Sequence, residues 1–379
     1  MSIFEIAFSG FSLFYAACML FFYAGILREE RRERNTSVNP LPRVSVIVSA
    51  RNEETRIMPL LNSLIVQDYP ADRFEVLIVD DRSTDDTFEL VSEFIRSRHL
   101  KNFRCLKHQP ESTDEPTYKK HAILFGINTS SGEIVLTTDA DCRVPSTWVR
   151  SMESRYDTKT GLVAGLVAYD AENDTVFKRM QALEFAGLVF TGVGAIGNNT
   201  PLICNASNLS YRRIAFESVG GFAGHEHIPS GDDDLLMQNI DQKTNWEIRY
   251  NLDSAGTVST NPVNSVAEFL NQRARWASKS RDYPGSQTFF VLLAIYLFYV
   301  ALFLAIPLAL FGIISWWMPI LALGLKLGSE FLIVRHAAIA LGQRESLPLF
   351  PLAQSAQILY ILIAGFAGFF KLYRWRSIS

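Results

Sequence analysis

The sequence predicts an α/β domain with a mostly parallel sheet, flanked by N- and C-terminal transmembrane helices. Between residues 43 and 262, short β-branched apolar runs alternate with segments of helical pattern. Such alternation is typical of parallel sheets that helices cover on both faces. Residues 6–27, 283–325 and 346–370 carry no charged side chain. About 20 apolar residues suffice to cross a bilayer, so each of these runs is long enough to span a membrane.

Residues 1–27 are predicted to form the N-terminal transmembrane helix. A cleaved signal peptide is the alternative, but the basic residues follow this apolar run instead of preceding it. Residues 28–42 form a basic linker that contains four arginines. Because positive residues collect on the cytoplasmic side of membrane helices, we expect this linker in the cytosol.

Residues 286–379 are predicted to form a C-terminal transmembrane region with two or three spans. Three spans would place Lys371, Arg374 and Arg376 outside the cell. Two spans and a re-entrant or interfacial piece would place them in the cytoplasm. Residues 263–285, before this region, are predicted to form an amphipathic helix at the membrane surface.

Lys326 and Glu330 lie within the C-terminal apolar region, four residues apart. That spacing puts both side chains on one face of a helix, so we expect them to pair inside the bundle. A transport site is the alternative that we consider less favoured.

Composition and motifs exclude several classes of protein. The formal net charge of −3 gives no basic field for nucleic acid. The chain has no P-loop motif for ATP and no glycine-rich dinucleotide fingerprint after a strand. Its four cysteines have no zinc-binding spacing, and free reduced thiols are expected.

Charged and polar side chains follow three predicted strands, residues 43–50, 74–81 and 133–141. They are Arg51, Asn52 and Glu53 after the first strand, Asp80 and Asp81 at the second, and Asp139 and Asp141 at the third. The carboxyl ends of parallel strands meet at one edge of a sheet, where ligands bind. Ser83 or Thr84 is expected to cap the helix that follows the second strand. Clustered carboxylates suit Mg²⁺ or Mn²⁺, which often bridge them to phosphate oxygens.

The order of five motifs resembles a known family. They are VSVIVSARNEE, VLIVDDRSTDDT, GEIVLTTDADC, SGDDDLL and QRARW. This set is similar to family 2 glycosyltransferases of the GT-A fold, in particular the membrane-embedded subset with the D, D, D, Q-x-x-R-W pattern. Ceramide glucosyltransferases, hyaluronan synthases and cellulose synthases belong to that subset. The resemblance covers about residues 43–280 and the flanking spans.

The resemblance implies a nucleotide-sugar pocket at the strand ends. Asp80 and Asp81 would contact the uracil and ribose of a UDP-sugar. Asp139 and Asp141 would hold Mg²⁺ or Mn²⁺ and, through it, the diphosphate, and Asp141 is the better candidate for direct coordination. The remaining residues that would line the donor pocket are Ala50, Arg51, Glu53 and Lys119.

The resemblance also implies the catalytic groups. In SGDDDLL, Asp233 would be the general base, Asp232 would support it, and Asp234 would start a helix. The other implied catalytic residues are Gln272, Arg275 and Trp276, which spacing places on one helix face. Candidates on the acceptor side are Asn205, Asn208, the turn at Gly220 and Gly221, and a loop with His225 and His227.

The resemblance implies transfer of a sugar, with inversion, from a nucleotide-sugar donor. Because three or four spans are few for the conduit of a polymer synthase, we expect the acceptor to be a lipid at the cytoplasmic leaflet. The short spans and the basic residues after the first of them predict a multi-pass protein of the cell inner (plasma) membrane with its catalytic domain in the cytoplasm. A processive polysaccharide synthase is the alternative, because Q-x-x-R-W occurs in both groups. A membrane protein that binds nucleotide sugars without turnover is a further alternative.

Overall fold

A computed structural model describes residues 3–32, 41–109, 119–171, 174–224, 228, 231–279, 283 and 286–373. The chain forms two compact units. The sheet unit comprises residues 29–168 and 199–261, and the helical unit comprises residues 1–28, 169–198 and 262–379.

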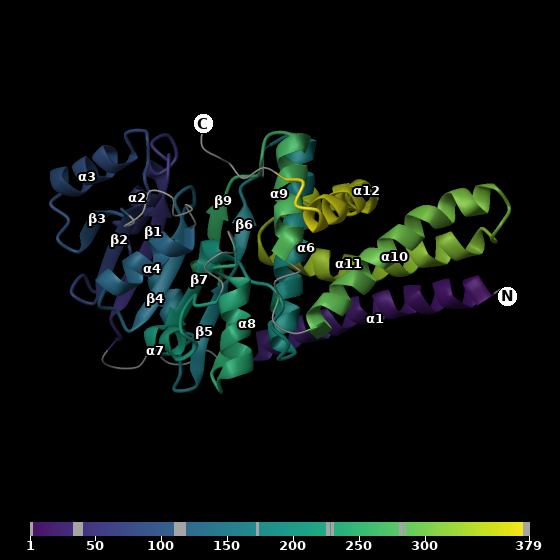
Figure 1. Ribbon diagram of the computed structural model, residues 1–379, viewed down its shortest axis with the longest axis horizontal. Helices are drawn as coiled ribbons and strands as arrows, with labels where there is room; N and C mark the ends of the chain where they lie inside the picture. Colours follow the sequence, from purple (N-terminus) through teal and green to yellow (C-terminus); the bar gives the residue numbers. More distant parts are fainter. Residues whose placement is uncertain are drawn as a thin grey trace. The chain divides into compact units, whose positions relative to one another are not determined.

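A seven-stranded sheet is the centre of the sheet unit (Figure 1). Its spatial order is β3-β2-β1-β4-β7-β5-β8, and β7 runs antiparallel to both of its neighbours while the other pairs are parallel. The mostly parallel α/β sheet expected from the sequence is therefore confirmed. The strands are β1 (Val44–Ala50), β2 (Phe74–Asp80), β3 (Phe103–Lys107), β4 (Ile134–Asp139), β5 (Thr160–Gly165), β7 (Leu209–Arg212) and β8 (Glu247–Asn251). A separate two-stranded sheet joins β6 (Val167–Tyr169) and β9 (Val258–Thr260).

The strand register brings the predicted acidic residues to one edge of the sheet. Ala50 at the end of β1 pairs with Asp80 at the end of β2. On the other side of β1, Ser49 pairs with Asp139 at the end of β4. Three strands thus end at one level, with a carboxylate on each side of the central strand.

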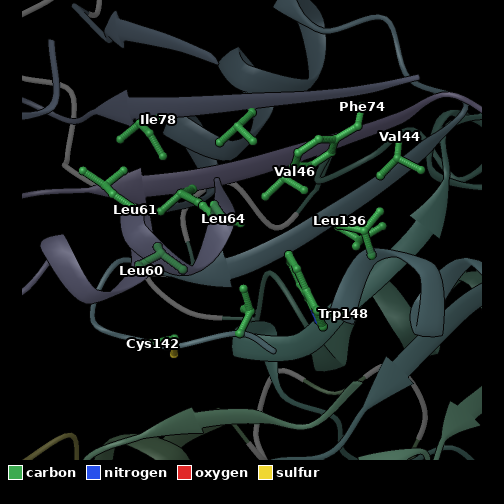
Figure 2. Packing of buried hydrophobic residues seen from close by; sticks show 14 of the residues in the cluster. Val44, Val46, Leu60, Leu61, Leu64, Phe74, Ile78, Leu136, Cys142 and Trp148 are labelled. Atoms are coloured by element: carbon green, nitrogen blue, oxygen red, sulfur yellow. The ribbon is translucent and has the colours of Figure 1, made fainter. Parts of the chain in front are cut away.

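Helices cover the sheet and complete a core. Leu60, Leu61 and Leu64 of α2 are buried in the same cluster as Val46 and Ile78, and Figure 2 shows their side chains against those of the strands. Each such leucine contributes about 1.5–3 kcal/mol when fully buried. The helices of this unit are α2 (Met58–Leu64), α3 (Thr87–Ser97), α4 (Lys119–Thr129), α5 (Trp148–Glu153), α7 (Arg213–Ser218) and α8 (Asp234–Lys243), with short 3₁₀ turns η1 (Ala206–Asn208) and η2 (Ser254–Gly256).

The expected cap of α3 is wrong. The N-cap position is Asp86, and no side chain caps the helix there. Ser83 and Thr84 instead bind the loop after β1, because Asn52 N donates to Ser83 Oγ at 3.0 Å and Thr84 N donates to Asn52 Oδ1 at 2.8 Å. Two loops at the carboxyl edge are therefore locked together, and local sequence could not reveal this long-range pairing.

The helical unit contains the long apolar helices. α12 packs against α9, and α11 packs against α6 (Figure 1). Within the described residues, five helical segments are long and apolar enough to cross a membrane: Glu5–Arg31, Val176–Gly197, Thr288–Leu310, Trp317–Ala340 and Arg344–Phe369. The elements are α1 (Ile3–Arg31), α6 (Val176–Gly197), α9 (Val266–Ser278), α10 (Ser286–Leu310), α11 (Trp317–Ala340), η4 (Arg344–Leu349) and α12 (Phe350–Phe369).

These candidate spans agree with the expected N-terminal helix and with up to three C-terminal ones, while α6 was not foreseen as a span. Most of the basic linker, at residues 33–40, lies outside the described residues, as do Arg374 and Arg376. The predicted pair of Lys326 and Glu330 is confirmed at 3.0 Å.

Small residues allow α1 and α6 to approach closely within the helical unit. A Cβ atom added to Gly194 would lie 2.1 Å from the carbonyl oxygen of Phe22, and one added to Gly25 would lie 1.9 Å from the carbonyl oxygen of Gly194. Close backbone approach at small residues is typical of helix pairs in membranes.

Gly194→Val should therefore destabilise the helical unit. Overpacking of a filled interface costs about 1–3 kcal/mol, so thermal unfolding in detergent should begin at a clearly lower temperature. Gly324→Ala is the control, because a Cβ atom there meets nothing within 4 Å. If both variants unfold like the wild type, the close contact of α1 and α6 is refuted.

Candidate active site

A lysine bridges two of the predicted acidic residues. Lys119, the first residue of α4, places Nζ 2.5 Å from Oδ1 of Asp139 and 3.2 Å from Oδ2 of Asp232. Asp139 ends β4, and Asp232 lies just before α8. The side chains of Lys119 and Asp139 are 28% and 34% exposed, so the cluster remains accessible to a ligand. The fold thus joins three segments that are far apart in sequence through one ammonium group.

Lys119 and Asp139 each stabilise the charged form of the other. Burial opposes the charged form of Lys119, but the carboxylates of Asp139 and Asp232 outweigh burial and hold its pKa above the ordinary lysine value. Burial likewise opposes ionisation of Asp139, yet Lys119 and a hydrogen bond from Ser207 hold the pKa of Asp139 below its usual value. Lys119 and Asp139 therefore both stay charged at neutral pH.

Residues 204–207 connect the end of β4 to the start of α8. The Ser207 hydroxyl donates to Oδ2 of Asp139. Ala206 N donates to Oδ2 of Asp233 at 3.3 Å, and Cys204 N donates to Oδ1 of Asp234 at 2.8 Å. Asp234 is the first residue of α8, as predicted, and Asp233 caps the helix by accepting from Asp234 N.

Asp139, Asp141 and Cys142 form a group that fits a metal ion. One potential ligand atom from each lies within 4.8 Å of the others. A tight turn, closed by Cys142 N donating to Asp139 O at 3.1 Å, brings them together. Carboxylate oxygens match hard cations such as Mg²⁺ and Mn²⁺. Burial raises the pKa of the Cys142 thiol, so the two aspartates are the fitting ligands.

Asp80 and Asp81 form a second polar group at the same edge. Asp81 lies 3.1 Å from Nδ1 of His108 and 3.6 Å from Nε of Arg82. Oδ2 of Asp80 accepts from Ser83 N at 3.4 Å, whereas its Oδ1 is buried with no hydrogen-bond partner among the described residues. A buried acceptor without a partner is costly, so this oxygen is suited to accept from a ligand N–H or O–H.

Sequence reasoning missed His108 and Ser207. His108 directly follows β3, so it belongs to the same set of strand ends as the acidic residues. In the sequence, the short run FRCLK just before His108 could have indicated the strand that places it there. Ser207 had no signal in sequence, because η1 reaches Asp139 only through the antiparallel pairing of β7 with β4.

The other predicted donor-pocket residues have defined surroundings. The carbonyl of Ala50 accepts from Asp81 N at 2.8 Å, which joins the ends of β1 and β2. Arg51 follows directly in the loop, half-buried. Glu53 pairs with Arg56 at 2.8 Å, and its backbone N–H donates to Thr87 Oγ1. These contacts give Glu53 a role in the loop structure, whatever it contributes to a ligand.

The acceptor-side candidates have folding roles. Asn208 accepts from Trp148 Nε1 at 2.9 Å and donates to the carbonyls of Leu166 and Gly256, both at 2.8 Å. Asn205 caps η1. The turn at Gly220 and Gly221 has φ of 77° and 61°, a conformation that favours glycine. The predicted loop with His225 and His227 lies outside the described residues.

Gln272, Arg275 and Trp276 lie on α9, in the helical unit. This helix lies within the predicted range 263–285, and Ser265 caps it by accepting from Glu268 N. The ring of Trp276 lies 5.9 Å from that of Phe185, centroid to centroid.

Comparisons with known proteins identify a family. A model of Glycosyl transferase family 2 matches residues 45–220, and one of Glycosyl transferase family group 2 matches residues 134–365. Beta-monoglucosyldiacylglycerol synthase of Nostoc sp. is 28% identical, over 62% of this chain and 48% of that protein. Glycosyltransferase AglE of Haloferax volcanii is 32% identical, over 51% of this chain and 59% of that protein. The chain therefore spans about half the length of these curated relatives.

One solved structure resembles the chain over nearly its whole length. It is titled as mannosyltransferase PcManGT from Pyrobaculum calidifontis in complex with GDP-Man and Mn²⁺. The TM-score is 0.62 at 20% identity, and the match covers 97% of this chain and 98% of that one. At this identity the likeness shows the shared fold, and with the family match it confirms the expected GT-A fold.

Removing the charge of Lys119 should strengthen cation binding at Asp139 and Asp141. An ammonium group beside Asp139 repels a second cation, and unit charges 4 Å apart interact by about 1 kcal/mol even in water. We therefore expect Lys119→Met to bind Mn²⁺ at least about fivefold more tightly than the wild type when no other ligand is present. Mn²⁺ titration followed by electron paramagnetic resonance measures this. Lys119→Arg keeps the charge and is the control, and equal affinities for all three proteins would place the cation elsewhere.

Proposed function

The chain belongs to glycosyl transferase family group 2, and from this premise we propose that it transfers a sugar from a UDP-sugar to a membrane lipid, with inversion. Mg²⁺ or Mn²⁺ would be held by Asp139 and Asp141. The lipid would be glycosylated at the cytoplasmic leaflet of the plasma membrane, by a multi-pass protein whose sheet unit lies in the cytosol.

The observation that carries the proposal is the register of β1, β2 and β4. It aligns Asp80 and Asp139 on either side of the central strand. Asp80 offers a buried oxygen that has no partner among the described residues, and Asp139 adjoins both Asp141 and the cation Lys119. This edge thus combines hydrogen-bond acceptors for a nucleoside with groups that bind a metal and a diphosphate.

A carboxylate at the start of α8 would act as the general base. Asp233 is our candidate: it would take the proton of the acceptor hydroxyl as that oxygen attacks the anomeric carbon. General base catalysis of this kind contributes roughly 10²–10⁴-fold. Both oxygens of Asp233 accept a backbone N–H, which fixes the orientation of the carboxylate. Asp232, which is paired with Lys119, would support Asp233.

The leaving diphosphate needs positive charge as its bond to the sugar breaks. A divalent cation bound to Asp139 and Asp141 would supply most of that charge. Lys119 is paired with Asp139, one of these two carboxylates, so it would bind a phosphate oxygen of the donor. Arg275 would add a further cation, while Gln272 and Trp276 would bind the sugar or the acceptor.

A lipid acceptor is supported by the apolar helices and by the relatives. Five helices are long and apolar enough to cross a membrane, and one relative is named a beta-monoglucosyldiacylglycerol synthase. A polysaccharide synthase would make products of many lengths, whereas a lipid glycosyltransferase would make one product. Product analysis therefore separates the two functions.

The proposal is tested by incubating the purified full-length protein with a panel of UDP- and GDP-sugars, Mg²⁺ or Mn²⁺, and a lipid extract that includes diacylglycerol, ceramide and polyprenyl phosphate. We expect one glycolipid from a UDP-sugar, and none after chelation of the metal. Mass spectrometry identifies the product. A ladder of polymer lengths would favour the synthase, and binding of donors without any product would favour the non-catalytic alternative.

Asp233→Asn should retain metal-dependent donor binding and lower the transfer rate by at least about 10²-fold, because the amide cannot accept the proton. Asp232→Asn is the matched variant and should lose less. The opposite ranking would assign the base to Asp232. Isothermal titration measures donor binding, and Asp141→Ala should abolish its dependence on the metal.

A further inference from the structure

A second cluster of buried polar side chains surrounds Arg273 in the helical unit. The Arg273 side chain is 5% exposed. Its Nε donates to Oε1 of Glu184 at 3.0 Å, and its Nη2 pairs with Oε2 of the same carboxylate. The hydroxyl of Tyr360 donates to Oε1 of Glu184 at 2.7 Å. One acidic side chain of α6 thus holds α9 through Arg273 and α12 through Tyr360.

Aromatic rings of α9 fix the guanidinium further. Its Cζ lies 4.5 Å from the ring centroid of Phe269 and 4.2 Å from that of Trp276. A planar guanidinium stacks on aromatic faces, and two hydrogen bonds to one carboxylate set its plane. Arg273 is therefore held in one orientation, against a residue of the predicted Q-x-x-R-W motif.

The orientation of Arg273 decides which end of the Gln272 amide can meet a ligand. Nη1 of Arg273 donates to Oε1 of Gln272 at 2.7 Å, and the Tyr169 hydroxyl lies 3.4 Å from the same oxygen. Arginine has only donors, so the amide atom beside it must be the oxygen. Nε2 of Gln272 makes no hydrogen bond within the described part of the chain. Gln272 therefore offers a ligand N–H donors and not an acceptor.

We propose that Glu184 is a positioning residue for sugar transfer, an inference that rests on the proposed function. Through Arg273, it holds Oε1 of Gln272 against the protein and leaves Nε2 to donate to a phosphate or hydroxyl oxygen of the substrates. Tyr360 supports this role by orienting the carboxylate of Glu184. The membrane-region helices thereby set the hydrogen-bonding character of the motif on α9.

The test is a double-mutant cycle between Glu184→Gln and Gln272→Leu in the full-length protein, with transfer measured at saturating donor. Glu184→Gln puts an amide N–H against the guanidinium and should lower kcat/KM roughly tenfold, as expected for residues of one hydrogen-bonded network. In the Gln272→Leu background the same change should lower kcat/KM no further. Losses that multiply would overturn the proposal, because a residue that only stabilises the fold acts whether or not Gln272 is present.

The donor role of Gln272 has its own test. Gln272→Glu keeps the size of the side chain but offers acceptors only. We expect it to be at least as impaired as Gln272→Leu, and transfer within twofold of the wild type would overturn the donor assignment.

Glu330→Gln is the matched control for Glu184→Gln. It also removes a carboxylate from a buried ion pair, but Glu330 contacts Lys326, Tyr15 and Tyr299, none of which is on α9. We expect wild-type kcat/KM for this variant. A loss as large as that of Glu184→Gln would show a general effect on the helices and would overturn the positioning role.

The wild-type protein separates the two possible failures. If it transfers no sugar, the proposed function fails and this inference fails with it. If it transfers sugar and the cycle is multiplicative, only the positioning role fails. Thermal unfolding in detergent monitors folding, and Tyr360→Phe, which removes one hydrogen bond and no charge, replaces Glu184→Gln in the cycle if that variant does not fold. It should show a smaller loss with the same dependence on Gln272.

Discussion

The sheet unit depends on one electrostatic constraint: carboxylates that the strand register gathers at one edge must face positive charge. Lys119 meets this constraint by pairing with Asp139 and Asp232. A cation in the first turn of a helix is itself unfavourable, by about 0.3–1 kcal/mol, because the helix dipole is positive there. The two ion pairs reverse that preference. The ion pairs at the sheet edge, and not the preferences of α4, thus explain the position of Lys119. Any metal ion that binds Asp139 shares the carboxylate of Asp139 with Lys119.

The backbone around that edge is held in conformations that short-range preferences do not favour. Asn52 and Arg82 have φ of 54° and 60°. Asparagine tolerates the left-handed region, whereas arginine does so rarely. Contacts between the two loops, from Asn52 to Ser83 and Thr84, hold these conformations. Such strain collects at functional sites when the surrounding structure enforces it. The strained turns flank Asp80, whose buried Oδ1 has no hydrogen-bond partner in the part of the chain that the structure describes.

Periodicity in the sequence was sufficient to predict the strands that bear acidic residues, because buried parallel strands are apolar along their whole length. It was insufficient for contacts that arise only when distant segments meet. Ser207 reaches Asp139 through an antiparallel strand pair, and His108 follows a short strand of mixed polarity. The cap expected at Ser83 or Thr84 failed for the same reason, since a long-range partner, Asn52, bonds to both residues.

The sequence did not predict α6 as a candidate membrane span, because the criterion was a run without charged residues and α6 contains some. Residues 43–262 look like one sheet domain, yet residues 176–197 within them form a candidate span of the helical unit. The charge of Glu184 interrupts the apolar pattern of α6. That charge is paired with Arg273 and hydrogen-bonded by Tyr360, which offsets part of the cost of burying it and ties α6 to α9 and α12. Apolar side chains in place of Glu184 and Arg273 would preserve packing. Among the described residues, only the Tyr169 hydroxyl would then donate to Oε1 of Gln272. We therefore infer that this buried pair is retained for orientation more than for stability.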